Sequence, residues 1–337
     1  MFIEYKNCIY CKSKSLTKER DQSFLENFYV KAIKSDLNLS NNKLKKIKIH
    51  RCNRCNILQN SPWFNADTSL RIYSNIYGQH NRNWTNLINF IEKQIKPNHG
   101  SLFKILTKNI KIKNYAEFNS PFMGLFINFF ENEYKKNRFF YKNFSKNILG
   151  YLTARQTAGT SKNYQKNSPK IARKYLKQIN FFKNKKIRKQ IINKYLFVDN
   201  SNLCWWQNDN YKSVNSRSYA SELLDLKILD LNKTIKQKKI DLFGIFHTLD
   251  HTFEPKKILD FALKNSKYVI VYCHTDKKLN KQHLFSLTNN FLKYLNKNKI
   301  YTFDLTNKIE KKFKSPELYF ICSRKKNLIN KIKQNVY

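Results

Sequence analysis

Short runs rich in β-branched and aromatic residues alternate with helical stretches from residue 114 onward. The runs cover 114–118, 195–199, 227–230, 241–246 and 268–273, and a last pair follows at 300–305 and 318–323. Strands that alternate with helices form a mostly parallel sheet that is covered on both faces. The pattern therefore predicts an α/β fold, with the last pair able to form a hairpin at the edge of the sheet.

Two Cys-x-x-Cys pairs stand near the N-terminus and supply four of the seven cysteines in the chain. In a large chain without an export signal, this spacing favours a metal site over disulfides. Two such turns that face each other complete the tetrahedral four-sulfur shell of a structural Zn²⁺ site. We predict a zinc ribbon over residues 1–66, against the alternative of four ordinary cysteines. The predicted ligands are Cys8, Cys11, Cys52 and Cys55.

The remaining segments are assigned from their composition and from the spacing of their apolar residues. Residues 67–95 place apolar residues on one helical face, up to a Pro97-Asn98-His99-Gly100 breaker. This assigns 67–100 to a helical linker and 101–337 to the α/β domain. The long, aromatic and lysine-rich stretch 128–190 is predicted to be a mostly helical insertion without an assigned function. The three remaining cysteines are expected in the core; they are Cys204, Cys273 and Cys322.

The chain is strongly basic, with 65 Lys+Arg against 23 Asp+Glu and a net charge of +42. The lysines are scattered through every segment, which indicates a bias of the whole chain instead of one binding face. Specific nucleic-acid binding is therefore not expected. A zinc-ribbon nucleic-acid-binding protein that uses this charge stays open as an alternative.

The N-terminal residues lack the charged leader, apolar stretch and cleavage site of a secretory signal. No apolar run approaches the roughly 18 residues that a membrane helix needs. We therefore expect a soluble, cytoplasmic protein that does not bind a membrane.

Three segments carry a resemblance to a known family. They are the paired cysteine turns, the tyrosine-rich run Ile72-Tyr-Ser-Asn-Ile-Tyr-Gly-Gln-His80, and Asp241-Leu-Phe-Gly-Ile-Phe-His-Thr-Leu-Asp-His251 with Phe253-Glu-Pro255 after it. The chain resembles class I S-adenosylmethionine-dependent methyltransferases with an N-terminal zinc-binding domain, a group that includes sugar C-methyltransferases. The resemblance implies a Rossmann-like seven-strand methyltransferase sheet with S-adenosylmethionine as the cofactor. Pro255 suits the first turn of a helix, and Glu254 would complement the positive end of its dipole.

The loop after the first strand departs from the family pattern. The resemblance implies cofactor binding by Glu117 at the acidic position, by Asn119 in place of the first glycine, and by Gly124. Pro121 and Met123 replace the next two glycines of the family. Because Pro121 cannot adopt positive φ, the loop must have another shape or another ligand. A strand-turn-helix in a fold that has lost its cofactor is the alternative.

Two further acidic residues end predicted strands. The resemblance implies that Asp199 binds the cofactor ribose, since a carboxylate accepts hydrogen bonds from both hydroxyls, and that Asp230 contacts the adenine. Each residue can equally belong to a simple turn.

The candidate catalytic residues are His247, Asp250 and His251, which follow the fourth strand at the edge where ligands bind in open α/β sheets. Histidine suits proton removal from a methyl acceptor at neutral pH. His247 would face the cofactor and His251 the substrate, whereas the alternative has them cap a helix or bond a backbone carbonyl. Three more histidines can reach the same edge, and sequence does not rank them; they are His80, His274 and His283.

Together these features predict a methyltransferase that acts on a small-molecule or sugar acceptor. The resemblance implies that the acceptor is a nucleotide-linked or surface-polysaccharide sugar. A catalytically silent methyltransferase-like scaffold is the second hypothesis, because of Pro121 and Met123. The zinc-ribbon nucleic-acid-binding protein is the third.

Overall fold

A computed structural model describes residues 2–22, 47–65, 96–118, 195–199, 228–230, 240–275, 283–310 and 317–336, with a few further positions at 93, 124–126, 128–129, 131–132, 170 and 174. Several predictions made above lie outside these residues. They are the linker helices over 67–95, most of the insertion over 128–190, and the positions of His80, Asn119, Pro121, Met123 and Cys204. Within the described ranges, every helix is too short or too polar to cross a bilayer.

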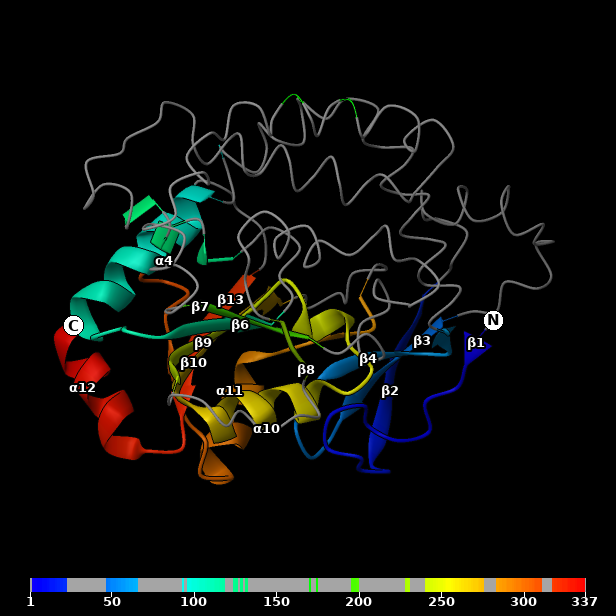
Figure 1. The fold of residues 1–337 in the computed structure, drawn as a ribbon. Helices are drawn as coiled ribbons and strands as arrows, with labels where there is room; N and C mark the ends of the chain where they lie inside the picture. The colour runs from blue at the N-terminus through cyan, green and yellow to red at the C-terminus, as the bar shows by residue number, and fades with distance from the viewer. Residues whose placement is uncertain are drawn as a thin grey trace.

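A seven-stranded mixed sheet forms the centre of the molecule (Figure 1). Its strands are β6 (Tyr115–Phe118), β7 (Tyr195–Asp199), β8 (Ile228–Asp230), β9 (Ile240–Phe246), β10 (Ser266–His274), β12 (Tyr301–Asp304) and β13 (Glu317–Ser323). The order across the sheet is β12-β13-β10-β9-β6-β7-β8. The predicted α/β fold is confirmed, and each predicted run lies within two residues of an observed strand.

The order of the strands creates a switch point in the sheet. The chain runs from β6 outward through β7 to β8, and then returns to place β9 on the other side of β6, with all these strands parallel. In open α/β sheets, ligands bind outside the carboxyl ends of the strands at such a point. Here that position lies beyond Phe118 of β6 and Phe246 of β9.

The opposite edge of the sheet is antiparallel. β13 pairs antiparallel with β10 and with β12, so the predicted hairpin of the last two strands is confirmed. Its second strand is inserted between β10 and β12, which leaves β12 at the edge.

The central strands are buried on both faces because their sequences are nearly continuous apolar runs. Every residue of β9 and of β13 is buried. Gly244 in β9 makes room for a neighbouring side chain, since a Cβ there would lie 2.3 Å from the hydroxyl oxygen of Tyr115. That space lets the Tyr115 hydroxyl reach the carboxylate of Glu117.

Helices flank the sheet. In Figure 1, α10 (Pro255–Asn265) and α11 (Asn289–Lys297) lie below it, while α4 (Lys96–Asn109) and α12 (Lys326–Val336) lie together at the left. Pro255 occupies the first position of α10, as predicted, where a missing N–H breaks no intrahelical bond. The helix has one apolar face, formed by Ile258, Leu259, Ala262 and Leu263.

The Pro97–Gly100 segment is not a breaker, and this prediction was wrong. These residues form the first turn of α4, which begins at Lys96 and continues to Asn109. A proline in the first turn of a helix costs no hydrogen bond, so Pro97 is compatible with the start of α4.

The N-terminal residues form a second, antiparallel sheet of four strands in the order β11-β4-β3-β2. Its strands are β2 (Leu16–Gln22), β3 (Ile47–Cys52), β4 (Leu58–Ser61) and β11 (Phe285–Ser286). Strand β1 (Phe2–Ile3) pairs separately with β5 (Trp63–Phe64). Because β11 lies far along the chain, the N-terminal sheet is completed by a strand that follows β10.

The N-terminal unit and the large sheet share one hydrophobic core. That core includes cysteines of the first unit together with apolar residues of β10, α10 and α11. The ring of Tyr10, for example, packs edge-on against Phe291 of α11 with 4.9 Å between the ring centroids. Cys273 and Cys322, predicted as core residues, are fully buried in it.

Candidate functional site

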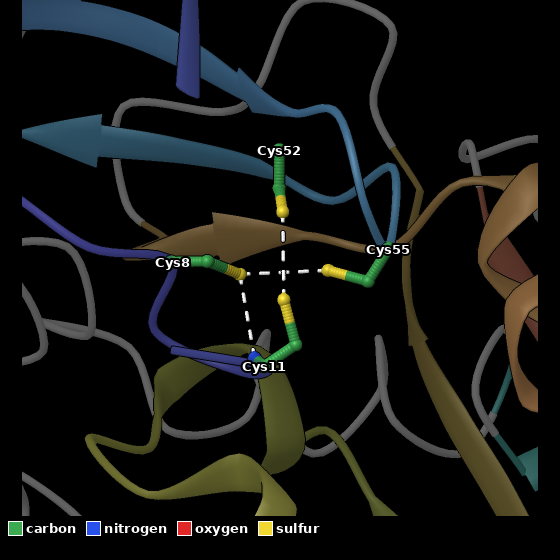
Figure 2. Close-up of side chains that lie close together, drawn as sticks. All are labelled: Cys8, Cys11, Cys52 and Cys55. Carbon is green, nitrogen blue, oxygen red and sulfur yellow. Dashed lines mark hydrogen bonds between the residues drawn. The ribbon is translucent and has the colours of Figure 1, made fainter. Parts of the chain in front are cut away.

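Four cysteine side chains converge where the two Cys-x-x-Cys turns face each other, and we call them the four-cysteine cluster. Figure 2 shows the sulfur atoms of Cys8, Cys11, Cys52 and Cys55 pointing toward one another, all within 4.8 Å. Two contacts join the turns, from Cys8 to Cys55 at 3.4 Å and from Cys11 to Cys52 at 3.5 Å. A disulfide needs about 2.05 Å between its sulfurs, so these are free thiols. A tetrahedral ion with Zn–S bonds of about 2.3 Å would set its sulfurs roughly 3.8 Å apart, close to the observed contacts.

The two turns have the same backbone geometry. The Lys12 N–H donates to the Cys8 carbonyl at 3.0 Å, and the Asn56 N–H donates to the Cys52 carbonyl at 2.8 Å. Lys12 and Asn56 also both adopt left-handed backbone, with φ of 60° and 63°. In the first turn, the Cys11 N–H donates to the sulfur of Cys8 at 3.4 Å. Equivalent turns therefore present two sulfurs each to a common centre.

The donor set suits a metal that prefers thiolates. Contact with Cys55 lowers the pKa of the Cys8 thiol to about 5, whereas the same contact raises the pKa of Cys55 and burial raises the pKa of Cys11 to about 12. One thiolate therefore forms readily, and a metal ion would have to displace the protons of the other thiols. Cys8, Cys52 and Cys55 are buried, which shields the centre from water. Four sulfur ligands fill a tetrahedral shell and leave no position for a reacting water, so such a site is structural.

Five of the seven histidines gather beside the carboxyl ends of β9 and β10. Their rings follow one another in the order His99, His247, His274, His283 and His251, and we call them the histidine row. Successive ring centroids are 5.7, 5.8, 4.4 and 4.3 Å apart. His99 belongs to α4, His247 directly follows β9, and His274 ends β10. His283 lies two residues before β11, and His251 ends the 3-10 helix Leu249–His251. The tertiary structure thus assembles a continuous set of imidazoles from distant segments.

Asp250 lies against the middle of the histidine row. One carboxylate oxygen, Oδ2, accepts hydrogen bonds from His274 Nδ1 at 3.0 Å and from the His274 backbone N–H at 3.2 Å. His283 Nε2 is 3.7 Å from the same oxygen. Burial acts to raise the pKa of Asp250, but attraction to His283 and His274 in their protonated forms, together with the hydrogen bonds from His274, outweighs this effect and lowers it. Asp250 is therefore an ionised carboxylate, and among the described residues its other oxygen, Oδ1, has no hydrogen-bond partner.

Burial favours the neutral form of four of the five histidines of the row. Burial lowers the pKa of His99 to about 4 and the pKa values of His247, His251 and His283 well below 6.5. A neutral imidazole accepts a proton or binds a metal ion through its free ring nitrogen. The ligand atoms of Asp250, His251 and His283 also lie within 4.8 Å of one another, a set that offers two imidazoles and a carboxylate to a cation.

His247 has an unusual backbone at the end of β9. Its φ is +50°, a left-handed value that is uncommon for residues other than glycine. The conformation is supported by the His247 N–H, which donates to the Tyr272 carbonyl at 3.0 Å, and by ring packing on Tyr272 at 4.0 Å. Residues held in such conformations cluster at active sites and ligand contacts.

The loop after β6 connects directly to the histidine row. Glu117 is fully buried and accepts a hydrogen bond from the Leu125 N–H at 3.2 Å. Gly124 packs on the Glu117 carboxylate so closely that a Cβ at this position would lie 2.4 Å from its Oε1. His99 Nδ1 donates to the Gly124 carbonyl at 3.1 Å, because the carbonyl can only accept. The predicted cofactor residues Glu117 and Gly124 are thus in contact, and His99 links them to the row.

Asp199 and Asp230 end the adjacent parallel strands β7 and β8, and their Cα atoms are direct partners across the ladder. Both therefore lie at the carboxyl edge of the sheet, on the β6 side of the switch point. Asn119, the other predicted cofactor residue, is outside the described residues.

Sequence reasoning missed His99. His247, Asp250 and His251 are brought together as a group, and His274 and His283 join them. His99 was missed because it was assigned from sequence to a helix breaker, Pro97–Gly100. A signal was available, because His99, Leu102 and Leu106 follow the i, i+3, i+7 spacing of one helix face, and all three are buried.

No family model and no curated protein matches the chain. Among solved structures, one similar chain is magnesium protoporphyrin IX methyltransferase from Synechocystis PCC 6803 with bound SAH. The similarity covers 74% of this chain and 91% of that chain, at 10% sequence identity and a TM-score of 0.34. A TM-score of this size carries no inference about function. The proposed function therefore rests on the residues and topology of the chain itself.

Proposed function

We propose that the chain is an S-adenosylmethionine-dependent methyltransferase with a small-molecule acceptor and a structural Zn²⁺ bound by the four-cysteine cluster. The family resemblance favours a sugar as the acceptor. The observation that carries the proposal is the hydrogen bond from His99 to the Gly124 carbonyl. Through it, the loop that the resemblance assigns to the cofactor meets the histidine row at the switch point of the sheet.

The described part of the cofactor region fits S-adenosylmethionine. Gly124 packs closely on the buried Glu117, which brings together two residues that the resemblance assigns to the cofactor. Asp199 and Asp230 are proposed to contact the ribose and the adenine, because both end strands at the ligand-binding edge. When bound, the cofactor supplies an electrophilic methyl group. The mixed seven-stranded sheet is consistent with the fold that the resemblance implies.

The histidine row supplies acid–base chemistry for the acceptor. A neutral His251 or His283 accepts the proton that an attacking hydroxyl or carbon loses, and His247 lies on the cofactor side. Each of the two imidazoles lies close to ionised Asp250, which stabilises the imidazolium that forms. The carboxylate also holds His274 by a hydrogen bond to Nδ1, which fixes the orientation of the middle ring.

The catalytically silent scaffold and the nucleic-acid-binding protein remain the rival functions. A silent scaffold would lack affinity for the cofactor, whereas the nucleic-acid-binding protein would need neither Asp250 nor the buried histidines. The assembly of three imidazoles around the buried carboxylate of Asp250 favours an enzyme, because clustered buried ionisable groups are costly to bury and gather at functional sites.

Calorimetry with S-adenosylhomocysteine on the purified chain tests the proposal. We expect measurable binding, weakened in Asp199→Ala by about 1.5–3 kcal/mol for the lost hydrogen bonds to a charged group. Asp260→Ala is the matched control, since Asp260 is a carboxylate on the exposed side of α10 that pairs with Lys256. His251→Gln should bind the cofactor product normally but lose roughly 10²- to 10⁴-fold in methyl transfer. Absence of wild-type binding at millimolar ligand would support the silent scaffold.

A further inference from the structure

We infer that Asn60 of β4 is a positioning residue for His283, so that the four-cysteine unit sets the geometry of the histidine row. The role of the row in methyl transfer rests on the proposed function. The positioning itself rests only on contacts between the two units, and it can be tested without turnover.

Asn60 binds the backbone carbonyls of two consecutive residues, His283 and Leu284. Its side-chain Nδ2 donates to the His283 carbonyl at 2.8 Å, and its backbone N–H donates to the Leu284 carbonyl at 2.9 Å. Asn60 is fully buried and His283 is only 3% exposed, so the hydrogen bond between them is shielded from water. Two consecutive carbonyls of the segment that carries the imidazole are therefore fixed by one residue of the N-terminal unit.

The next residues extend this attachment. Phe285 of β11 pairs antiparallel with Gln59 of β4, and the Thr288 hydroxyl donates to the Asn56 carbonyl at 2.9 Å. Asn56 directly follows Cys55, so this second attachment ends on the cysteine turn itself.

Gln59 connects β4 to the other cysteine turn. Its Oε1 accepts the Ile9 N–H at 2.9 Å, and its Nε2 donates to the Asn7 carbonyl at 3.1 Å. These two residues flank Cys8. A metal that orders both turns therefore orders β4, and β4 in turn holds the segment 283–288.

The ring of His283 lies at the other end of this connection. It stacks on His274 at 4.4 Å, meets His251 at 4.3 Å, and has its Nε2 3.7 Å from Asp250. The side chain is thus placed in the histidine row while its main chain is bound to the N-terminal sheet. A shift of the main chain moves the imidazole relative to Asp250 and to the acceptor. Displacements of about 1 Å in such a group reduce turnover by roughly 100-fold.

Asn60→Asp tests the inference at a pH where the new carboxyl is ionised, because the side chain then keeps its size but cannot donate to the His283 carbonyl. Asn53→Asp is the matched control, since Asn53 lies in the second cysteine turn and its Nδ2 donates to Ser15 on the exposed side of the same unit. Histidine-labelled protein is observed by NMR, with the His283 ring signals identified from a His283→Gln sample. His50 of β3 serves as an internal reference.

We expect Asn60→Asp to retain its metal and its fold, to shift the His283 ring signals, and to reduce kcat about 100-fold with little change in the KM for cofactor. Asn53→Asp should change none of these. Unshifted His283 signals in folded Asn60→Asp would overturn the inference. If Asn60→Asp does not fold, Thr288→Val removes the second attachment and should shift the same signals. Shifted signals in a protein that transfers no methyl group would refute the proposed function and leave the positioning intact.

Discussion

At the scale of single residues, two local requirements define the site. Gly124 is needed because its φ is +38° and because any side chain would meet the Glu117 carboxylate. His247 has a left-handed φ as well, but its ring and N–H are both engaged by Tyr272. The motif around His247 was predicted from sequence, since consecutive residues carry it. The contact between Gly124 and Glu117 depends on tertiary packing, which no local pattern encodes. For His99 the helical spacing with Leu102 and Leu106 indicated a buried position, but its contact with Gly124 also depends on tertiary packing.

Gly124→Ala should destabilise the protein by about 1–3 kcal/mol, the cost of forcing atoms into an occupied space. It should also weaken binding of S-adenosylhomocysteine, because the loop must move away from Glu117. Urea unfolding and calorimetry measure the two effects. Combining Gly124→Ala with Glu117→Ala removes the atoms that clash, so the double variant should lose less stability than the sum of the single variants. Strictly additive losses would contradict the proposed contact.

At the scale of elements, the alternation of β-rich runs with helical stretches predicted each strand of the large sheet to within two residues. They could not predict that β13 enters between β10 and β12, because pairing partners are chosen by tertiary contacts. The error at Pro97 has a different cause. Proline signals a boundary, and sequence alone did not distinguish the start of α4 from the end of a preceding helix.

The cysteine turns are elements whose stability depends on a ligand. Cys52→Ser should reduce zinc from about one equivalent per chain to well below it, and it should lower the melting temperature, since binding and local folding are coupled. Elemental analysis and thermal unfolding measure these changes. The matched control is Cys322→Ser, because Cys322 is a buried cysteine of β13 outside the four-cysteine cluster. It should lose stability but keep its metal.

The metal content also tests the chemistry of the histidine row. About one zinc per chain agrees with proton transfer by neutral imidazoles. A second equivalent that survives Cys52→Ser but is lost in His283→Gln would show that Asp250, His251 and His283 bind a cation, and it would replace the proposed proton transfer.

At the scale of the whole molecule, the structure buries four histidines that acid would charge. The pKa values of His99, His247, His251 and His283 are all lowered by burial in the folded state, whereas an unfolded histidine titrates near 6.5. Below that pH the unfolded state binds more protons than the folded state, so stability falls as the pH falls.

We therefore expect the melting temperature to decrease steeply between pH 7 and pH 5. Each fully buried histidine contributes up to about 1.4 kcal/mol per pH unit below its unfolded pKa. Thermal unfolding over a pH series measures the slope. His251→Gln should melt with a shallower dependence on pH, because one protonation is removed from the unfolded state. A melting temperature that is constant over this range would refute the neutral, buried state of these four histidines.

The charge of +42 is also a property of the whole molecule. Because the lysines are dispersed through the sequence, we expect polynucleotide binding to be weak and insensitive to sequence. Raising salt from low to about physiological concentration should largely abolish it, since such binding is driven by counterion release. Fluorescence anisotropy with several unrelated oligonucleotides measures both properties. Sequence-selective binding at physiological salt would instead favour the nucleic-acid-binding function.

The insertion of β13 between β10 and β12 has a consequence for biosynthesis. The ribosome delivers β10 well before β13, so one edge of β10 waits unpaired while more than forty residues are added. Strand β4 waits even longer for β11, although its other neighbour, β3, directly precedes it in the chain. We expect nascent chains arrested before residue 317 to remain sensitive to protease and to recruit chaperones, because unpaired strand edges attract other chains. Maturation of the protein is then a late event, triggered by emergence of its final strand.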